Sequence, residues 1–298
     1  MSPFQKANIF LTLCTILWGA TFVVLKVSLL QISPLLLVAV RFGMAALFLT
    51  PFILIRNPAK AFSALTEKGI LKHSFYLSLM MTAGFGFQTA GLQYTTASRS
   101  AFITELLILF TPVFQYFTVR KLPGIGNYLG MILILPGMYL LTSFGDNELN
   151  IGDALTFFCA LGFAMYITYL DYFSRLYDEI NFLYWQLIFT AIIAGILAFF
   201  TEEPVFEIEL NSLLSLLYLS LAGTLVAVYW QIRYQKHTTP VQAGILYSLE
   251  PVFATIFAVI FLSESPDLYF FSGAGLILAG VILSHTYDGR KKWLRHFH

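Results

Sequence analysis

The hydrophobic positions of the chain fall into long runs that short polar segments separate. Ten runs are long enough to cross a bilayer, because a helix needs about 20 apolar residues to span a hydrocarbon core of about 30 Å. They cover roughly residues 8–28, 34–55, 73–95, 99–120, 125–143, 153–173, 182–200, 212–236, 240–262 and 268–286. The runs lack the short alternating segments of a transmembrane β-barrel. The pattern therefore predicts an all-α integral membrane protein with ten transmembrane helices.

Composition agrees with this prediction. Of the 298 residues, 58% are hydrophobic and 11% are charged, whereas soluble domains carry about 25% charged residues. So few charges do not cover the surface of a soluble domain of this length. Cys14 and Cys159 lie inside predicted spans, so we expect two buried free thiols and no structural disulfide.

Basic residues are distributed unevenly between the two sides of the predicted bundle. If the N-terminus is cytoplasmic, fourteen of the seventeen basic residues lie on the cytoplasmic side, including the basic tail 289–298, and the opposite loops carry mostly acids. Lys and Arg favour cytoplasmic loops. We therefore expect a multi-pass plasma membrane protein, the inner membrane in a bacterium, with both termini cytoplasmic. We expect the tail to contact anionic lipids and not nucleic acid.

The two halves of the chain resemble each other. "FQTAGLQYTT" at 87–96 is matched 143 positions later by "WQIRYQKHTT" at 230–239, and "TPVF" at 111–114 by "EPVF" at 250–253. Gly130 and Gly137 are matched by Gly273 and Gly280 at the same offset, and "LTLCTILWGA" at 11–20 by "LTFFCALGFA" at 155–164. An ordered series of matches indicates a duplication. It predicts two repeats, 1–145 and 146–288, followed by the tail.

Each repeat holds five predicted helices, so the second repeat crosses the membrane in the opposite direction. Inverted repeats are typical of secondary transporters, in which two halves frame a site near the middle of the bilayer. The pattern therefore favours a transporter that works by alternating access. An integral-membrane enzyme and a channel-like facilitator remain as alternatives. Against an enzyme, the five histidines lie at span ends or in the tail, and the chain has no HExxH, GxSxG or phosphate-binding loop. We expect no metal or cofactor.

The chain resembles the EamA-type ten-helix permeases of the drug/metabolite transporter superfamily. The resemblance rests on "WGATFVVLK" (18–26), "RFGMAALFL" (41–49), "QYTTASRSAFITELLILFTPVF" (93–114) and "QAGILYSLEPVFATIFAVIFLSE" (242–264). It implies export or exchange of small polar metabolites such as amino acids, through a cavity between the halves. That cavity would lie between helices 1, 3 and 4 and their counterparts 6, 8 and 9.

Three ionisable residues are predicted at a similar depth in the first repeat. Lys26, Arg41 and Glu105 each lie within a span near its non-cytoplasmic end, where an ionisable side chain costs roughly 2.5–3.5 kcal/mol on insertion scales. Two arrangements are open. Glu105 forms a fixed pair with Arg41 or Lys26, or the three groups surround a charged solute or a proton. Lys26 could also extend to the lipid headgroups.

The second repeat contributes an acid of its own, and both repeats contribute polar and aromatic candidates. Glu250 lies near the middle of the ninth run, directly before Pro251, where a proline removes a backbone donor and allows a kink. It could bind a proton or solute, or bond a free carbonyl. Gln88 and Gln231 could bind a polar solute or connect helices. Trp18, Tyr94, Trp230 and Tyr247 could line an aromatic cavity or pack at the interface.

Overall fold

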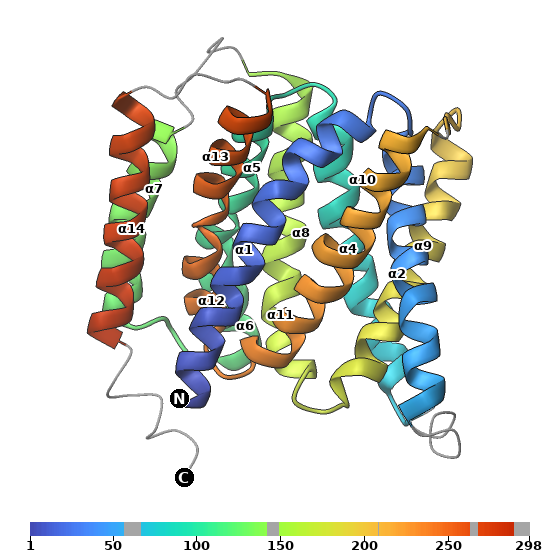
Figure 1. The fold of residues 1–298 in the computed structure, drawn as a ribbon. Coiled ribbons are helices and arrows are strands. Elements are labelled where there is room, and N and C mark those ends of the chain that lie inside the picture. Colours follow the sequence, from blue (N-terminus) through green and yellow to red (C-terminus); the bar gives the residue numbers. More distant parts are fainter. Residues whose placement is uncertain (57–66, 142–148, 208, 263–267, 289–298) are drawn as a thin grey trace.

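The protein is a bundle of helices in a computed structural model that describes residues 1–56, 67–141, 149–207, 209–262 and 268–288. The first repeat contains α1 (Pro3–Ser28), α2 (Pro34–Arg56), α4 (Ile70–Leu92), α5 (Ala97–Glu105), α6 (Leu107–Val119) and α7 (Ile125–Leu141). The second contains α8 (Ile151–Phe173), α9 (Glu179–Thr201), α10 (Leu210–Ser220), the π-helix η1 (Leu221–Val226), α11 (Ala227–Gln235), α12 (Pro240–Tyr247), α13 (Glu250–Leu262) and α14 (Leu268–Asp288). Figure 1 shows α1 beginning and α14 ending on the same face, which we call the N-terminal face.

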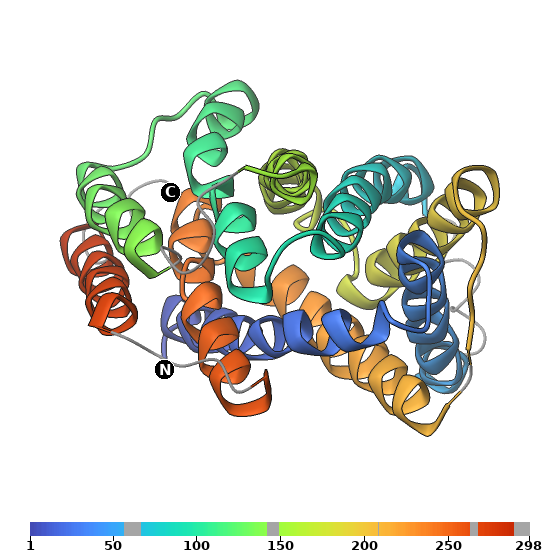
Figure 2. The same cartoon turned by 90° about the horizontal axis from the view of Figure 1, so that it is seen from above.

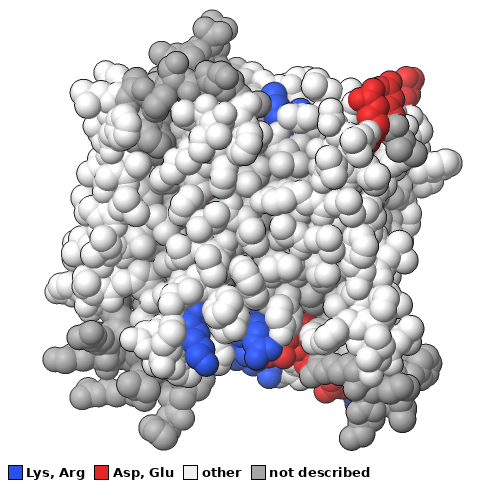
Figure 3. Space-filling view, in the orientation of Figure 1, with Lys and Arg blue, Asp and Glu red and all other residues white. Residues whose placement is uncertain are grey.

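These helices account for the ten predicted spans. Seven helical stretches are long and apolar enough to cross a membrane, and α7 and α14 are shorter apolar helices. The tenth, α4, has 23 residues but includes glycines and polar side chains. Figure 3 shows that Lys, Arg, Asp and Glu gather at the two ends of the visible surface, with an uncharged band between them. Such a band matches the hydrocarbon core of a bilayer. The predicted ten-helix membrane fold is confirmed.

Three spans are interrupted. The fourth consists of α5 and α6, which meet at Leu106, and the ninth consists of α12 and α13, which are separated by Ser248 and Leu249. The two breaks therefore occur at matching positions of the repeats. The break in the ninth span lies just before Pro251, as a proline in a helix predicts. The eighth span contains η1, where the wider π-helical turn changes the direction of backbone carbonyls.

Helix packing follows the inverted relation between the repeats. Helix α2 packs against its counterpart α9, and α7 packs against its counterpart α14. Helix α4 of the first repeat packs against α8, just as α11 of the second packs against α1. Seen from above, α7 and α14 lie together at one side of the bundle, and α2 and α9 lie together at the other (Figure 2). The remaining helices occupy the middle, around the site described below.

Matched glycines allow the closest helix contacts. A Cβ placed on Gly130 of α7 would lie 2.8 Å from the carbonyl oxygen of Gly280 on α14, and one on Gly280 would lie 2.7 Å from that of Gly130. A Cβ on Gly137 would likewise lie 2.8 Å from the Gly273 carbonyl oxygen. Small residues let membrane helices approach so closely that their backbones touch. The matched glycines thus build the α7–α14 pair.

The repeated threonines begin equivalent helices. Thr96 accepts a hydrogen bond from the N–H of Arg99 at 3.2 Å and so caps α5. Thr239 accepts one from the N–H of Gln242 at 3.2 Å and caps α12. A threonine at this position satisfies one of the amides that an α-helix leaves unpaired at its start. The repeated threonine pair in the sequence therefore marks the start of the fourth and the ninth span.

Candidate functional site

A cavity lies in the middle of the bundle, between the two repeats. The space among its lining side chains, including the solvent space that adjoins it, is about 490 Å³. The lining residues come from α1, α4, α5, α6, α8, α11, α12 and α13. They are Trp18, Thr21, Phe85, Gln88, Thr104, Glu105, Leu107, Phe163, Tyr166, Ile167, Gln231, Tyr247 and Glu250. These helices correspond to spans 1, 3, 4, 6, 8 and 9, so the predicted position of the cavity is confirmed.

The two matched glutamines both reach the cavity. Gln88 on α4 donates a hydrogen bond to Thr104 Oγ1 at 3.2 Å, and Gln231 on α11 donates one to Gln235 Oε1 at 3.3 Å. Both side chains are buried. A side-chain amide can donate and accept several hydrogen bonds, so both residues are suited to bind a polar group in the cavity.

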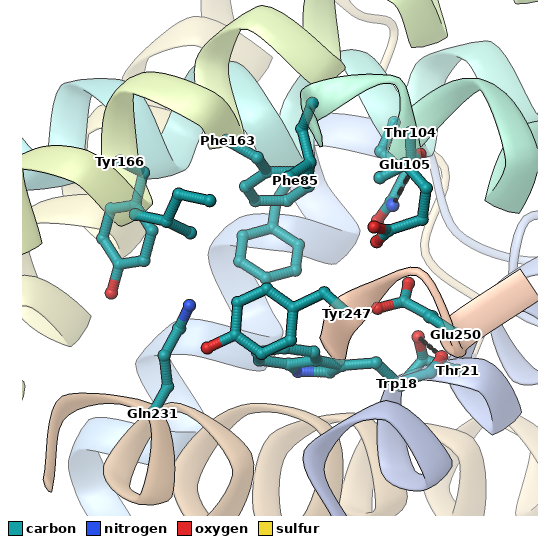
Figure 4. A pocket seen from close by; sticks show the side chains of 13 residues that line it. Trp18, Thr21, Phe85, Thr104, Glu105, Phe163, Tyr166, Gln231, Tyr247 and Glu250 are labelled. Carbon is teal, nitrogen blue, oxygen red and sulfur yellow. Dashed lines mark hydrogen bonds between the residues drawn. The ribbon is translucent and has the colours of Figure 1, made fainter. Parts of the chain in front are cut away.

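Aromatic rings form the middle of the cavity (Figure 4). Trp18 and Tyr247 meet edge to face with ring centroids 5.4 Å apart, and Phe85 and Phe163 do so at 4.9 Å. The Trp18 indole also donates a hydrogen bond to the Gly223 carbonyl at 3.1 Å, which fixes its ring against η1. These contacts hold the rings in defined orientations.

The two acids of the cavity face each other. Figure 4 shows the carboxyl groups of Glu105 on α5 and Glu250 on α13 pointing toward one another. Only 1% of Glu105 and 6% of Glu250 is exposed, and the two groups interact electrostatically. Glu105 Oε2 makes no hydrogen bond within the described part of the chain. The break between α12 and α13 places Glu250 at the first turn of α13, where its side chain can reach the cavity.

The structure does not pair Glu105 with Arg41, which was one of the two arrangements that the sequence left open. The fully buried Arg41 points to the second repeat, where its Nε donates to Thr224 Oγ1 at 2.9 Å and its Nη2 to the Gly223 carbonyl at 3.3 Å. Its guanidinium also lies 4.8 Å from the Phe85 ring centroid. The π-helical turn of η1 presents these acceptors. Similar depth in the membrane does not bring two side chains together when their helices direct them toward different neighbours.

Lys26 does not pair with Glu105 either. Its Nζ donates to the carbonyl oxygens of Leu92 at 2.8 Å and Thr95 at 2.7 Å. A helix leaves its last carbonyls without intrahelical partners, and Lys26 binds these groups at the end of α4. It thereby ties α1 to α4 on the face opposite the N-terminal face.

Two aromatic candidates lie away from the cavity. Tyr94 is 57% exposed and lines a separate hollow with Gln93 and Val205 on the face opposite the N-terminal face. Trp230 packs with its ring centroid 5.2 Å from that of Phe10 on α1. Trp230 neighbours Gln231 in sequence, but adjacent residues on a helix point in different directions. The structure therefore places Trp18 and Tyr247 at the cavity and excludes Tyr94 and Trp230 from its lining.

Sequence reasoning missed Phe85, Phe163 and Tyr166. The chain has 30 phenylalanines and 16 tyrosines, and hydrophobic runs alone do not show which ring faces inward. One signal was available for Phe163. A Cβ on Gly84 would lie 2.5 Å from the Phe163 ring, so the glycine-rich stretch of α4 accommodates that ring.

A buried polar network lies on the N-terminal side of the cavity. Gln235 donates to the Ile167 carbonyl at 2.6 Å and accepts from the Tyr247 hydroxyl at 3.0 Å. Nearby, the Tyr166 hydroxyl donates to Gln186 at 3.0 Å. Such hydrogen bonds join helices without salt bridges. In the part of the chain that the structure describes, no group of three or more His, Cys, Asp or Glu is arranged to hold a metal ion.

The profile of the EamA-like transporter family matches the chain twice, over residues 5–143 and 150–286. Together the two matches cover nearly the whole sequence, one in each repeat. The chain belongs to the EamA-like transporter family. The family match, the ten-helix fold and the central cavity agree, and they identify the protein as a membrane transporter.

Relatives carry the same general description. An uncharacterized transporter of Archaeoglobus fulgidus is 35% identical over 280 residues, covering 93% of this chain and 85% of the relative. The uncharacterized transporter YoaV of Bacillus subtilis is 28% identical and covers 93% of this chain and 96% of its own. A WAT1-related chloroplastic protein of Arabidopsis thaliana is 25% identical over 91% of this chain and 67% of its own.

A solved structure shares the fold. One crystal structure of a protein superposes with a TM-score of 0.78 at 18% identity, covering 97% of this chain and 99% of the other. At this level of identity the likeness supports the arrangement of helices alone.

Proposed function

We propose that this EamA-family transporter is a secondary transporter that moves a small polar solute by alternating access between its two repeats. The observation that carries the proposal is the central cavity, which both repeats line at matching positions, as with Gln88 and Gln231. Inverted repeats provide two equivalent ways to open such a cavity, one toward each face of the membrane. Transport as export or exchange is part of this proposal.

The interruptions of the spans support the same mechanism. Breaks between α5 and α6 and between α12 and α13 border the cavity at Glu105 and Glu250. Transporters use such discontinuous helices at their binding sites because free backbone groups and short helix segments can move and bind solute there. A packed structural membrane protein gains nothing from paired breaks at the cavity.

Cysteine accessibility tests the proposal. In a protein lacking Cys14 and Cys159, we introduce Gln88→Cys or Gln231→Cys and reconstitute each into vesicles of known orientation. A membrane-impermeant thiol reagent should label both positions from either face, since each face opens in turn. Labelling from one face only, or of neither residue, contradicts alternating access. A solute flux that is faster than a protein can change conformation, and that does not saturate as the solute concentration rises, would instead support the channel-like facilitator.

A further inference from the structure

The cavity contains two buried carboxyl groups, and no basic side chain of the described residues lines it. Glu105 and Glu250 interact with each other, and neither makes an ion pair among the described residues. One oxygen of Glu105 is buried without any hydrogen-bond partner there. Buried carboxylates are costly unless a cation, a proton or hydrogen bonds compensate them. The pair therefore needs a partner that comes from outside the chain.

The nearest candidate cations of the first repeat are bound elsewhere. Lys26 is held by the carbonyls of Leu92 and Thr95. Arg41 stacks on Phe85, a wall of the cavity, and donates hydrogen bonds to η1, while its Nη1 is buried without a partner among the described residues. Arg41 is not one of the lining residues. No lysine or arginine lines the cavity in the described part of the chain. The cavity is thus built for positive charge and offers no cation to a carboxylate group of a solute.

The rest of the lining also suits a cation. Trp18, Tyr247, Phe85 and Phe163 lie between the carboxyl pair at one end of the cavity and Gln231 at the other end (Figure 4). The faces of aromatic rings attract cations and pack well against apolar groups. A solute with an ammonium group at the carboxyl pair would therefore place an apolar or aromatic body among these rings.

We propose that the cavity selects organic monocations, namely solutes with one amine or quaternary ammonium group on an apolar body, and that Glu105 and Glu250 bind the positive charge. This inference rests on the proposed transport function and narrows its substrate class. A free amino acid fits less well, because its carboxylate would enter a site that already holds two acids and no cation. The cavity thereby discriminates by charge among solutes of one size.

Binding of the cation competes with protonation of the carboxyl pair. When the cavity holds no solute, protons are the remaining source of compensating charge for two adjacent buried acids. Among the described residues, the titratable groups that interact with the pair from other helices are the Cys14 thiol on α1, the Cys159 thiol on α8 and the Tyr247 hydroxyl on α12. None of them is cationic. Lower pH should therefore weaken binding of a monocation.

Four probes with nearly the same body and different charge test the proposal. Phenethylamine is the cation, 2-phenylethanol is neutral, phenylalanine is the zwitterion and 3-phenylpropionate is the anion. Each is titrated into the purified full-length protein, and binding is measured by calorimetry and by the shift in unfolding temperature. We expect phenethylamine to bind at least tenfold more tightly than the other three. Its affinity should fall as the pH is lowered from 8 to 6.

Variants assign the charge selectivity to the pair. Glu105→Gln and Glu250→Gln keep the shape of the side chains, and each should reduce phenethylamine affinity at least tenfold and flatten its pH dependence. Glu207→Gln, which removes an exposed acid at the end of the bundle, is the matched control and should change neither. Circular dichroism and the unfolding temperature without ligand establish that the variants are folded.

Three results would contradict the inference. Tighter binding of phenylalanine or 3-phenylpropionate, no binding of any probe, or unchanged phenethylamine affinity in both folded glutamine variants would show that the pair does not select cations. The accessibility experiment at Gln88 and Gln231 does not depend on these ligands. A protein that alternates access but prefers a zwitterion keeps the proposed function and loses the proposed substrate class.

Discussion

At the scale of single residues, the sequence indicated which side chains are chemically costly but not which partners they have. Sequence analysis identified Glu105, Glu250 and the two glutamines because a polar side chain inside a membrane span costs free energy and commonly has a function. The partner of Arg41 could not be found in this way. Arg41 bonds the Thr224 hydroxyl and the Gly223 carbonyl in η1, which lie 183 and 182 positions away in sequence. A π-helical turn leaves no reliable mark in hydrophobic periodicity.

The separation of Arg41 and Glu105 makes a quantitative prediction. Because Arg41 binds η1 and Glu105 lies beside Glu250, Arg41→Met and Glu105→Gln should change the free energy of unfolding independently, with a coupling energy below about 0.5 kcal/mol. Reversible unfolding in mixed micelles of the wild type, both single variants and the double variant measures it. Arg99 and Asp153, whose side chains lie 2.7 Å apart, are the control pair and should couple by more than that.

A coupling above about 1 kcal/mol between Arg41 and Glu105, of the same size as in the control pair, would contradict this arrangement. The double variant would then be more stable than the sum of the single changes predicts. That outcome would return Glu105 to a structural role as the counter-ion of Arg41.

At the scale of elements, the repeat in the sequence predicted more than the hydrophobic runs did. The runs located each span but gave no sign of the breaks at Leu106 and at Ser248. The repeated threonines and glycines did carry structural information, although their role was visible only in three dimensions. Thr96 and Thr239 cap the segments that begin broken spans, and the matched glycines join α7 to α14.

The glycine contacts predict opposite effects of the same substitution within one helix pair. Gly130→Ala places a methyl group 2.8 Å from the Gly280 carbonyl oxygen, and overpacking of this kind costs about 1–3 kcal/mol. Gly275→Ala in α14 meets no atom within 4 Å, so it should be neutral or stabilising by up to about 1 kcal/mol through helix propensity. Unfolding temperatures in detergent compare the two. Equal losses would show that α7 and α14 do not pack as described.

At the scale of the whole molecule, the repeats share positions and differ in chemistry. At the offset of 143, Gln88 corresponds to Gln231 and Thr104 to Tyr247, and all four line the cavity. Leu107 corresponds to Glu250. Duplication thus predicts where the cavity lies, because equivalent positions face it. Charge and aromatic content came from later divergence, so no symmetry argument from sequence could supply them.

The orientation in the membrane is a prediction of the charge distribution. With the N-terminal face cytoplasmic, a reporter fused after Glu203 should be external, because α9 ends at Thr201 on the face opposite the N-terminal face. A fusion after Asp146, which lies outside the described residues, should give the same result. A cytoplasmic signal from both fusions would reverse the assignment, and the basic tail would then be external.

We expect hydrogen bonds at related places in the repeats to hold the two ends of the cavity closed. On the N-terminal side, Gln235 ties α11 to α8 through the Ile167 carbonyl at 2.6 Å. On the opposite side, Lys26 ties α1 to the end of α4 through the Leu92 carbonyl at 2.8 Å. Helices α1 and α4 are the counterparts of α8 and α11, and Leu92 is the counterpart of Gln235 at the offset of 143. Each bond stabilises closure of one end.

Replacing Lys26 and replacing Gln235 should therefore shift the access of the cavity in opposite directions. In the Gln88→Cys protein without Cys14 and Cys159, Lys26→Met should increase the rate of thiol labelling from the face opposite the N-terminal face and decrease it from the N-terminal face. Gln235→Leu should do the reverse, because two exclusive states share one equilibrium and a gain in one is a loss in the other. Each variant loses more than one such bond, because Lys26 also donates to Thr95 and Gln235 also accepts from Tyr247 and Gln231. At about 1 kcal/mol for each bond, the ratio of rates should change by at least about fivefold. Arg175→Met is the control. It removes a cation that is paired with Asp171 at 3.0 Å near the end of α8, and it should leave the ratio unchanged.

If both variants raised labelling from both faces at once, the cavity would be a continuous pore held shut at two ends, and the channel-like facilitator would replace the transporter with alternating access.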